Sequence, residues 1–264
     1  MKRRFPWVGA LWLVLGAAYF LVPLFATLAF SLKTSRNHYS LGAYSLILKD
    51  PAFRQSLAFS FKLALITVVF ALVLLVPTAY WVHLKLPRLR PVVEFLSILP
   101  FVVPPIVLVV GLLNGFRWTP TWFYGGYLLL VVGYVVLAFP YVYRSLDAGL
   151  RAMDVHTLTE AAQSLGADWR TVMFRVIVPN LRVSLLSAAF LTVAIVMGEF
   201  TMSSLMQFTT FAVYINYIGE SQATGAAALS LMSFAITWFA MLAILFVGRR
   251  LGRGGRQFQI GASR

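Results

Sequence analysis

Residues 56–81 read SLAFSFKLALITVVFALVLLVPTAYW and carry a single charged side chain, Lys62. An α-helix needs about 20 mostly apolar residues to cross the roughly 30 Å hydrocarbon core of a bilayer. The run lacks the two-residue alternation of a membrane barrel strand, and a helix satisfies its own backbone hydrogen bonds in lipid. The stretch therefore predicts a transmembrane helix and an all-α fold.

The composition extends this prediction to the whole chain. Of its 264 residues 60% are hydrophobic and 11% charged, and the mean hydropathy is +0.83, which is too apolar for a single soluble core. Six stretches are long enough to span a membrane, at residues 7–30, 56–81, 92–113, 122–143, 181–206 and 226–247. We expect a polytopic protein with one membrane domain over residues 1–264.

The net charge of +14 raises the question of a nucleic-acid partner, but the basic residues follow the membrane topology instead. Sixteen of the 22 lie on one side of the six predicted spans: Lys2, Arg3, Arg4, Lys85, Arg88, Arg90, Arg144, Arg151, Arg170, Arg175, Arg182, Arg249, Arg250, Arg253, Arg256 and Arg264. Because cytoplasmic connections are enriched in Lys and Arg, both termini, the 144–180 connection and the basic tail at 249–264 are expected in the cytoplasm. Basic residues are not interleaved with aromatic residues in a soluble domain, so we expect no nucleic-acid partner.

Several kinds of chemistry are not expected. The sequence has no cysteine, and its three histidines fall in separate connections, so it shows no metal site. It also lacks the G-x-x-x-x-G-K-[ST] phosphate-binding loop, so any ATP hydrolysis must occur in a partner. The first apolar run, behind Lys2, Arg3 and Arg4, is longer than a signal-peptide core, and we expect it to remain as a membrane anchor.

A polar segment, TEAAQSLGADWRTVMFRVIVPN at residues 159–180, interrupts the apolar pattern. Thr157 and Glu160 have the spacing of a capping box, which predicts a helix start at Thr157. Gly166 can end that helix in the left-handed conformation, and Asp168 can cap a second helix. The first helix presents a narrow apolar face of small and medium residues: Leu158, Ala161, Ala162 and Leu165.

The second helix of this segment has its own apolar stripe and is expected to stop at Pro179. The stripe consists of Trp169, Val172, Met173, Val176 and Ile177. Two interpretations remain open from the pattern alone. The helix–turn–helix either binds another protein or is an amphipathic connector on the membrane surface or beneath the bundle.

The spacing Glu160-Ala161-Ala162, Gly166, Val176, Val178 and Pro179 resembles the EAA motif of ABC importer permeases, EAA-x3-G-x9-I-x-L-P. Val176 and Val178 replace the motif's isoleucine and leucine. The resemblance implies a six-span permease fold in a bacterial inner membrane and a coupling helix that binds a cytoplasmic ATPase through Glu160, Ala161, Ala162, Leu165, Gly166 and Pro179. It also implies two ATP-binding subunits, a second permease subunit, identical or related, and an extracytoplasmic solute-binding protein. No cofactor is then bound by this chain itself.

Glu199 is the one acidic residue that lies deep in a predicted span, which makes it a candidate for the substrate pathway together with Ser203 and Ser204. The alternative is a buried glutamate paired with a nearby hydroxyl or backbone group.

Residues 197–205, MGEFTMSSL, resemble a segment of permeases for polyamines, ferric ion, thiamine and oxyanions. Residues 211–214 fall where that group has a short re-entrant piece. An acidic residue facing the pathway favours a cation, and the short chain with Pro104 and Pro105 in its third span looks most like the spermidine/putrescine type. We therefore expect a polyamine or similar cation, with ferric ion, thiamine, an oxyanion or an aminophosphonate as alternatives.

The third predicted span contains Pro100, Pro104 and Pro105. Prolines free backbone carbonyls and kink helices, so Pro104 and Pro105 form either a gate or a static kink. A secondary transporter or channel is the competing functional class, but it usually needs several ionisable sites within the membrane and internal repeats. A membrane enzyme would need a nucleophile and a base, or a metal set, that this sequence does not show.

Overall fold

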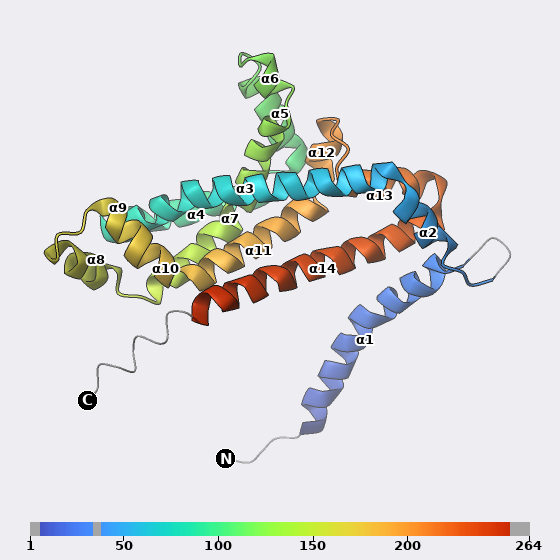
Figure 1. Ribbon diagram of the computed structural model, residues 1–264, viewed down its shortest axis with the longest axis horizontal. Helices are drawn as coiled ribbons and strands as arrows, with labels where there is room; N and C mark the ends of the chain where they lie inside the picture. The colour runs from blue at the N-terminus through green and yellow to red at the C-terminus, as the bar shows by residue number, and fades with distance from the viewer. Residues whose placement is uncertain (1–5, 34–37, 254–264) are drawn as a thin grey trace. The chain divides into compact units, whose positions relative to one another are not determined.

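The computed structural model describes residues 6–33 and 38–253, and most of these residues are helical (Figure 1). Within the described residues the extended pairing is limited to an isolated bridge between Lys33 and Tyr39. Four helices contain segments long and apolar enough to cross a membrane, namely α1 (Pro6–Ser31), α3 (Pro51–Leu84), α7 (Tyr127–Arg151) and α14 (Ala223–Arg253). Two bent helix pairs bring the number to six if each pair is one span. The all-α polytopic prediction is confirmed.

The third predicted span, 92–113, is broken into α4 (Arg90–Val102) and α5 (Pro105–Gly115), which meet at an angle of 104°. Pro104 and Pro105 lack amide hydrogens, and a residue before proline is driven out of the helical region. Val103 and Pro104 accordingly have ψ angles of 117° and 141°. The interruption expected at Pro104 and Pro105 is therefore present, whereas Pro100 stays inside α4 without ending it.

The fifth predicted span, 181–206, is shorter than expected. Its main helix, α11 (Arg182–Gly198), ends before Glu199, and a short helix, α12 (Thr201–Leu205), follows. A bend of 74° separates α11 from the helical segment Trp169–Asn180. The re-entrant piece expected near 211–214 falls in α13 (Phe211–Ser221).

The remaining helices are short connections between these elements. They are α2 (Gly42–Lys49), η1 (Pro87–Leu89), α6 (Thr121–Tyr124), α8 (Val155–Ser164), α9 (Trp169–Thr171), η2 (Val172–Ile177) and α10 (Val178–Asn180). The predicted basic tail, 249–264, begins inside α14, and its residues 254–264 lie outside the described residues, as do Lys2, Arg3 and Arg4.

The helices divide into two compact units. One contains residues up to 56 together with 213–236, and the other contains residues 57–212 and those from 237 onwards. Within the first unit the Tyr214 hydroxyl donates to the Asp50 carboxylate at 2.6 Å, and Ser31 and Tyr44 share a hydrogen bond of 2.7 Å. The second unit contains the main core and all the candidate site residues.

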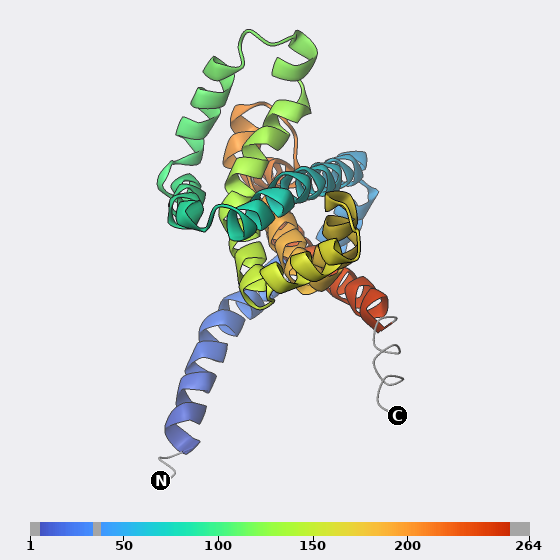
Figure 2. The ribbon, with the colours of Figure 1, turned by 90° about the vertical axis from the view of Figure 1, so that its left-hand side faces the viewer.

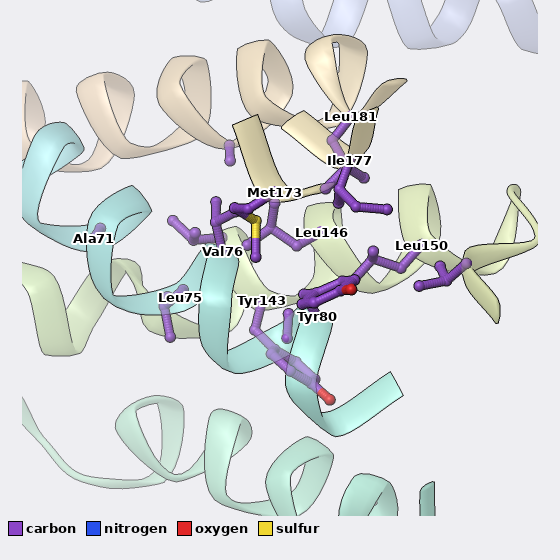
Figure 3. Close-up of a cluster of buried hydrophobic side chains, with 14 of the residues drawn as sticks. Ala71, Leu75, Val76, Tyr80, Tyr143, Leu146, Leu150, Met173, Ile177 and Leu181 are labelled. Carbon is purple, nitrogen blue, oxygen red and sulfur yellow. The ribbon is translucent and has the colours of Figure 1, made fainter. Parts of the chain in front are cut away.

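The core of the second unit joins α3, α7, α8, η2 and α11 into one apolar cluster. Figure 3 shows side chains of α3 and α7 meeting Met173, Ile177 and Leu181 from the segment that precedes α11. Its buried members are Ala71, Leu75, Val76, Ala79, Tyr80, Ala138, Val142, Tyr143, Leu146, Leu150, Val155, Val172, Met173, Ile177, Leu181 and Ala188. The 144–180 connection is thus packed into the core and is not a loose loop.

Candidate functional site

The first helix of the connection, α8, starts three residues earlier than predicted, since its cap is at position 154 and not 157. Its cap is Asp154, whose carboxylate accepts from the Thr157 amide at 3.1 Å and from the Thr157 hydroxyl at 2.7 Å. These hydrogen bonds hold the pKa of Asp154 below its ordinary value. The predicted Thr157–Glu160 capping box is wrong, because Asp154 already satisfies the amide of the first turn.

Gly166 ends α8 in the left-handed conformation, with a φ of +82°. The Gly166 amide donates to the Gln163 carbonyl at 2.9 Å, and the Ala167 amide donates to the Ala162 carbonyl at 3.0 Å. This pair of bonds is a Schellman motif, which satisfies carbonyls left open at a helix end. A Cβ at position 166 would meet no atom within 4 Å, so the backbone conformation, and not a close helix contact, favours glycine here.

The second helix of the connection begins as predicted at Asp168, whose carboxylate accepts from the Thr171 amide at 3.0 Å. The hydrogen bonds from Thr171 lower the pKa of Asp168. The remainder of this second helix is not a single α-helix as predicted, because residues 172–177 form the π-helix η2. The helical segment ends at Asn180, one residue after Pro179, and a bend of 74° follows before α11, so it stops close to the predicted position.

Burial divides the predicted stripe of the second helix. Val172, Met173 and Ile177 are buried in the core, whereas Trp169 is 41% exposed. Helix α8 is held through a different face from the one predicted, since its buried residues are Val155 and Thr159. The Thr159 hydroxyl and the Tyr80 hydroxyl of α3 share a buried hydrogen bond of 3.1 Å.

The predicted apolar face of α8 is divided, because Leu158 and Ala162 are half-buried, and Ala162 packs against the core cluster. Glu160 and Ala161 are exposed, and Leu165 is 89% exposed. Figure 1 shows α8 and α9 at the end of the unit where α3 and α7 finish, and Figure 2 shows the segment (yellow) doubling back on itself at that end. The connection therefore combines a firmly packed inner face with an exposed outer face, on which Ala161 and Leu165 lie beside Glu160 and other polar residues.

The candidate pathway residues lie together at the break between α11 and α12. Glu199 is half-buried, and its carboxylate accepts from the amides of Met202 at 2.8 Å and Ser203 at 3.2 Å. The Ser203 hydroxyl is buried, donates to the Phe200 carbonyl at 3.0 Å and accepts from Thr210 at 3.0 Å. Ser204 is half-buried, and its amide donates to the Phe200 carbonyl.

The position of Glu199 differs from the expectation of a carboxylate deep in a span. It follows the last residue of α11 and caps the first turn of α12, because a carboxylate accepts well from open amides at a helix start. The backbone pairing foreseen as the alternative for Glu199 is thus present. Tyr134 of α7, which sequence reasoning missed, is fully buried beside Glu199 and Ser203.

A second polar cluster, around Asp147 of α7, was also missed. The buried Asp147 carboxylate accepts from Arg90 at 2.9 Å, pairs with Arg151 at 2.8 Å and lies 3.1 Å from the His83 ring. The Arg151 spacing of four residues was visible in the sequence, but Arg90 is 57 residues away and is brought in by the packing of α4 on α7.

Comparison with known proteins agrees with this architecture. A family model described as "Binding-protein-dependent transport system inner membrane component" matches residues 76–254, more than half of the chain. The chain belongs to that family. Among its inner membrane components, the spermidine/putrescine transport system permease protein PotB of Salmonella typhimurium is 30% identical over 184 residues, which cover 64% of this chain and 63% of the relative. The chain thus spans just under two thirds of the length of that relative.

Two further similarities bear on fold and family. The molybdenum transport system permease protein ModB of Azotobacter vinelandii is 31% identical over 154 residues, 53% of this chain and 66% of the relative. A crystal structure of a bacterial ABC transporter involved in the import of the acidic polysaccharide alginate superimposes with a TM-score of 0.69 at 14% identity, covering 92% of this chain and 94% of that chain. At this identity the superposition supports the fold, which is that of an ABC importer permease.

Proposed function

We propose that this chain is the permease subunit of an ATP-driven ABC importer and forms half of a translocation pathway. Residues 1–264 act as one membrane domain, with the 144–180 connection, the 249–264 tail and both termini in the cytoplasm. A second permease subunit, identical or related, completes the pathway. Two ATP-binding subunits supply the energy, and an extracytoplasmic solute-binding protein delivers the solute. The chain itself is not an enzyme and binds no cofactor.

The observation that carries this proposal is the outer face of α8. Glu160, Ala161 and Leu165 are exposed on a helix whose other face is fixed to the core through Val155 and Thr159. Small side chains let a partner surface approach closely, and a helix anchored in this way moves together with α3 and α7. Such a geometry suits a rigid element that binds an ATPase and transmits its motion, with Gly166 and Pro179 setting the turn and the exit of the segment.

For the solute we propose a polyamine or a similar cation. The support is the similarity to spermidine/putrescine permeases, which extends over 64% of the chain. Glu199, with Ser203 and Ser204, is the proposed contribution to the pathway, and Pro104 and Pro105 are the proposed gate at the break between α4 and α5. The ferric ion, thiamine, oxyanion and aminophosphonate alternatives remain, since permeases named for ferric and for molybdenum transport are also similar to this chain.

The proposal is tested by mass spectrometry of the proteins that co-purify with this chain after gentle detergent extraction from its native membrane. We expect an ATP-binding subunit, a second permease and a solute-binding protein. The solute-binding protein is then titrated with putrescine, spermidine, ferric ion, thiamine, molybdate and an aminophosphonate. Purification of the chain without an ATP-binding subunit, under conditions that preserve other ABC complexes, would favour a secondary transporter or channel.

A further inference from the structure

A cavity of about 370 Å³ lies between α4, α7 and α11. Its volume falls within the range of about 300–1,000 Å³ that is usual for small-molecule sites. Ile98 and Phe101 of α4 and Leu191 of α11 form an apolar wall, and Glu94 and Arg144 supply charged groups. The cavity is thus apolar on one side and carries charges of both signs.

Arg144 and Glu94 are the charges in this cavity that other side chains engage least. Asp147 also lines the cavity, but its carboxylate is already engaged by Arg90 at 2.9 Å and Arg151 at 2.8 Å. The closest cation to Glu94 is Arg151 at 3.7 Å, and Arg151 holds Asp147 more tightly. Arg144 is exposed and forms no ion pair with any described residue.

Tyr143 provides an independent sign of a missing partner. It lines the cavity and is 2% exposed, yet its hydroxyl has no hydrogen-bond partner among the described residues. Leaving a buried hydroxyl unpaired is unfavourable by about 1–3 kcal/mol. The hydroxyl oxygen is itself buried, so a ligand in the cavity can become its partner only if the cavity wall shifts to expose it.

We infer that the cavity binds the zwitterionic headgroup of a phospholipid, with a phosphate at Arg144 and Tyr143 and an ammonium group at Glu94. A purely anionic headgroup would be repelled by Glu94, and a simple cation would be repelled by Arg144. A phosphoethanolamine headgroup carries both charges two carbon atoms apart. The wall formed by Ile98, Phe101 and Leu191 suits the start of an acyl chain.

The depth of the cavity fits a headgroup at the membrane surface. Its lining residues on α7 run from Pro140 to Asp147, so the deepest lies 11 residues before the end of the helix at Arg151, or roughly 16 Å at 1.5 Å per residue. The basic residues at these helix ends place the cavity in the cytoplasmic leaflet. Basic groups between helices on that side are a common feature of lipid headgroup sites.

The test is to purify the complete chain with its co-purifying subunits and reconstitute it in vesicles of equal parts phosphatidylethanolamine, phosphatidylglycerol and phosphatidylcholine. After brief detergent extraction, mass spectrometry counts the lipids retained per chain. We expect retained phosphatidylethanolamine to fall about tenfold or more in Arg144→Gln and in Tyr143→Phe. Glu94→Gln should shift retention towards phosphatidylglycerol, because it removes the group that repels an anion.

Arg88→Gln is the matched control, since Arg88 is an exposed arginine on the neighbouring η1 and does not line the cavity. It should leave lipid retention unchanged, and gel filtration should show that all variants keep the wild-type profile. Retention of phosphatidylethanolamine that is equal in wild type, Arg144→Gln and Glu94→Gln would overturn the inference. If free glycerophosphoethanolamine binds the cavity and no lipid is retained, the ligand is a soluble zwitterion and not a lipid. Retention of spermidine in the cavity would also overturn the inference.

Discussion

Tyr80 and Thr159 share a hydrogen bond of 3.1 Å between α3 and α8, in a place where both side chains are at most 2% exposed. Thr159→Val keeps the shape of the side chain but leaves the Tyr80 hydroxyl buried without a partner. We expect the free energy of unfolding to fall by about 2–3 kcal/mol, near the upper end for an unpaired buried hydroxyl. Tyr80→Phe leaves the Thr159 hydroxyl without Tyr80, but that hydroxyl can donate to the carbonyl four residues earlier in its own helix. We therefore expect a smaller loss of unfolding free energy, about 1 kcal/mol.

The double variant Tyr80→Phe/Thr159→Val replaces both polar groups and should cost less than the two single changes added together. We expect a coupling energy of about 1–2 kcal/mol, because the main penalty in each single variant is the unpaired hydroxyl. The assay is denaturant unfolding in detergent, combined with solute-dependent ATP hydrolysis in the assembled transporter. The single variants should lose solute stimulation of hydrolysis more than basal hydrolysis, because α8 is then fixed less firmly to α3.

Thr78→Val is the control, because the Thr78 hydroxyl is also on α3 but donates to the Leu74 carbonyl of its own helix on an exposed face. It should change stability by no more than about 0.5 kcal/mol. If the effects of Tyr80→Phe and Thr159→Val simply add, the hydrogen bond contributes nothing to the attachment of α8, and the reasoning is refuted.

Three further predictions concern the turn, the caps and the acidic residue at the α11–α12 break. Gly166→Ala should destabilise the α8 turn by about 1–2 kcal/mol, because an L-residue at a φ of +82° is strained. Gly198→Ala is the control, since a Cβ there also meets no atom within 4 Å, and it should destabilise the protein much less. Equal unfolding curves for the two variants would contradict this. Asp154 and Asp168 have lowered pKa values in the folded protein. The stability that their caps contribute is therefore fully present above the ordinary aspartate pKa of about 3.9 and is lost as pH falls through the lower pKa values of the folded state. Hydrogen exchange of the capped amides, corrected for its intrinsic pH dependence, should therefore speed up only below about pH 4, and an increase already at pH 6 would count against the caps. Glu199→Gln keeps an acceptor oxygen for α12 but removes the charge, so uptake of the proposed cation should be abolished with normal expression. Unchanged uptake would remove this residue from the pathway.

The local features of the 144–180 connection were largely readable from the sequence. The left-handed turn at Gly166 and the cap at Asp168 depend on residues within a few positions of each other. The start of α8 was misplaced because two capping patterns overlap there, and Asp154 competes successfully with Thr157. The π-helix at 172–177 has no comparable local signal, since its apolar residues also fit an ordinary amphipathic helix.

The features that depend on long-range packing could not be read in this way. Tandem prolines predict a break after Val103, but not its angle of 104°. Glu199 was assigned to a span because its neighbours are apolar, although α11 already ends at Gly198. The long-range partners of Asp147 and Thr159, unlike Arg151, come from α3 and α4, and no local spacing predicts them.

The central claim, that the outer face of α8 binds an ATP-binding subunit, can be tested at one position. The sequence contains no cysteine, so Leu165→Cys introduces a single thiol at a side chain that is 89% exposed. A photoactivatable cross-linker attached there in native membranes should yield an adduct with an ATP-binding protein, identified by mass spectrometry. Trp118→Cys, at a side chain that is 82% exposed in the connection after α5, should not. Adducts of Leu165→Cys that contain only lipid or this chain itself would contradict the claim.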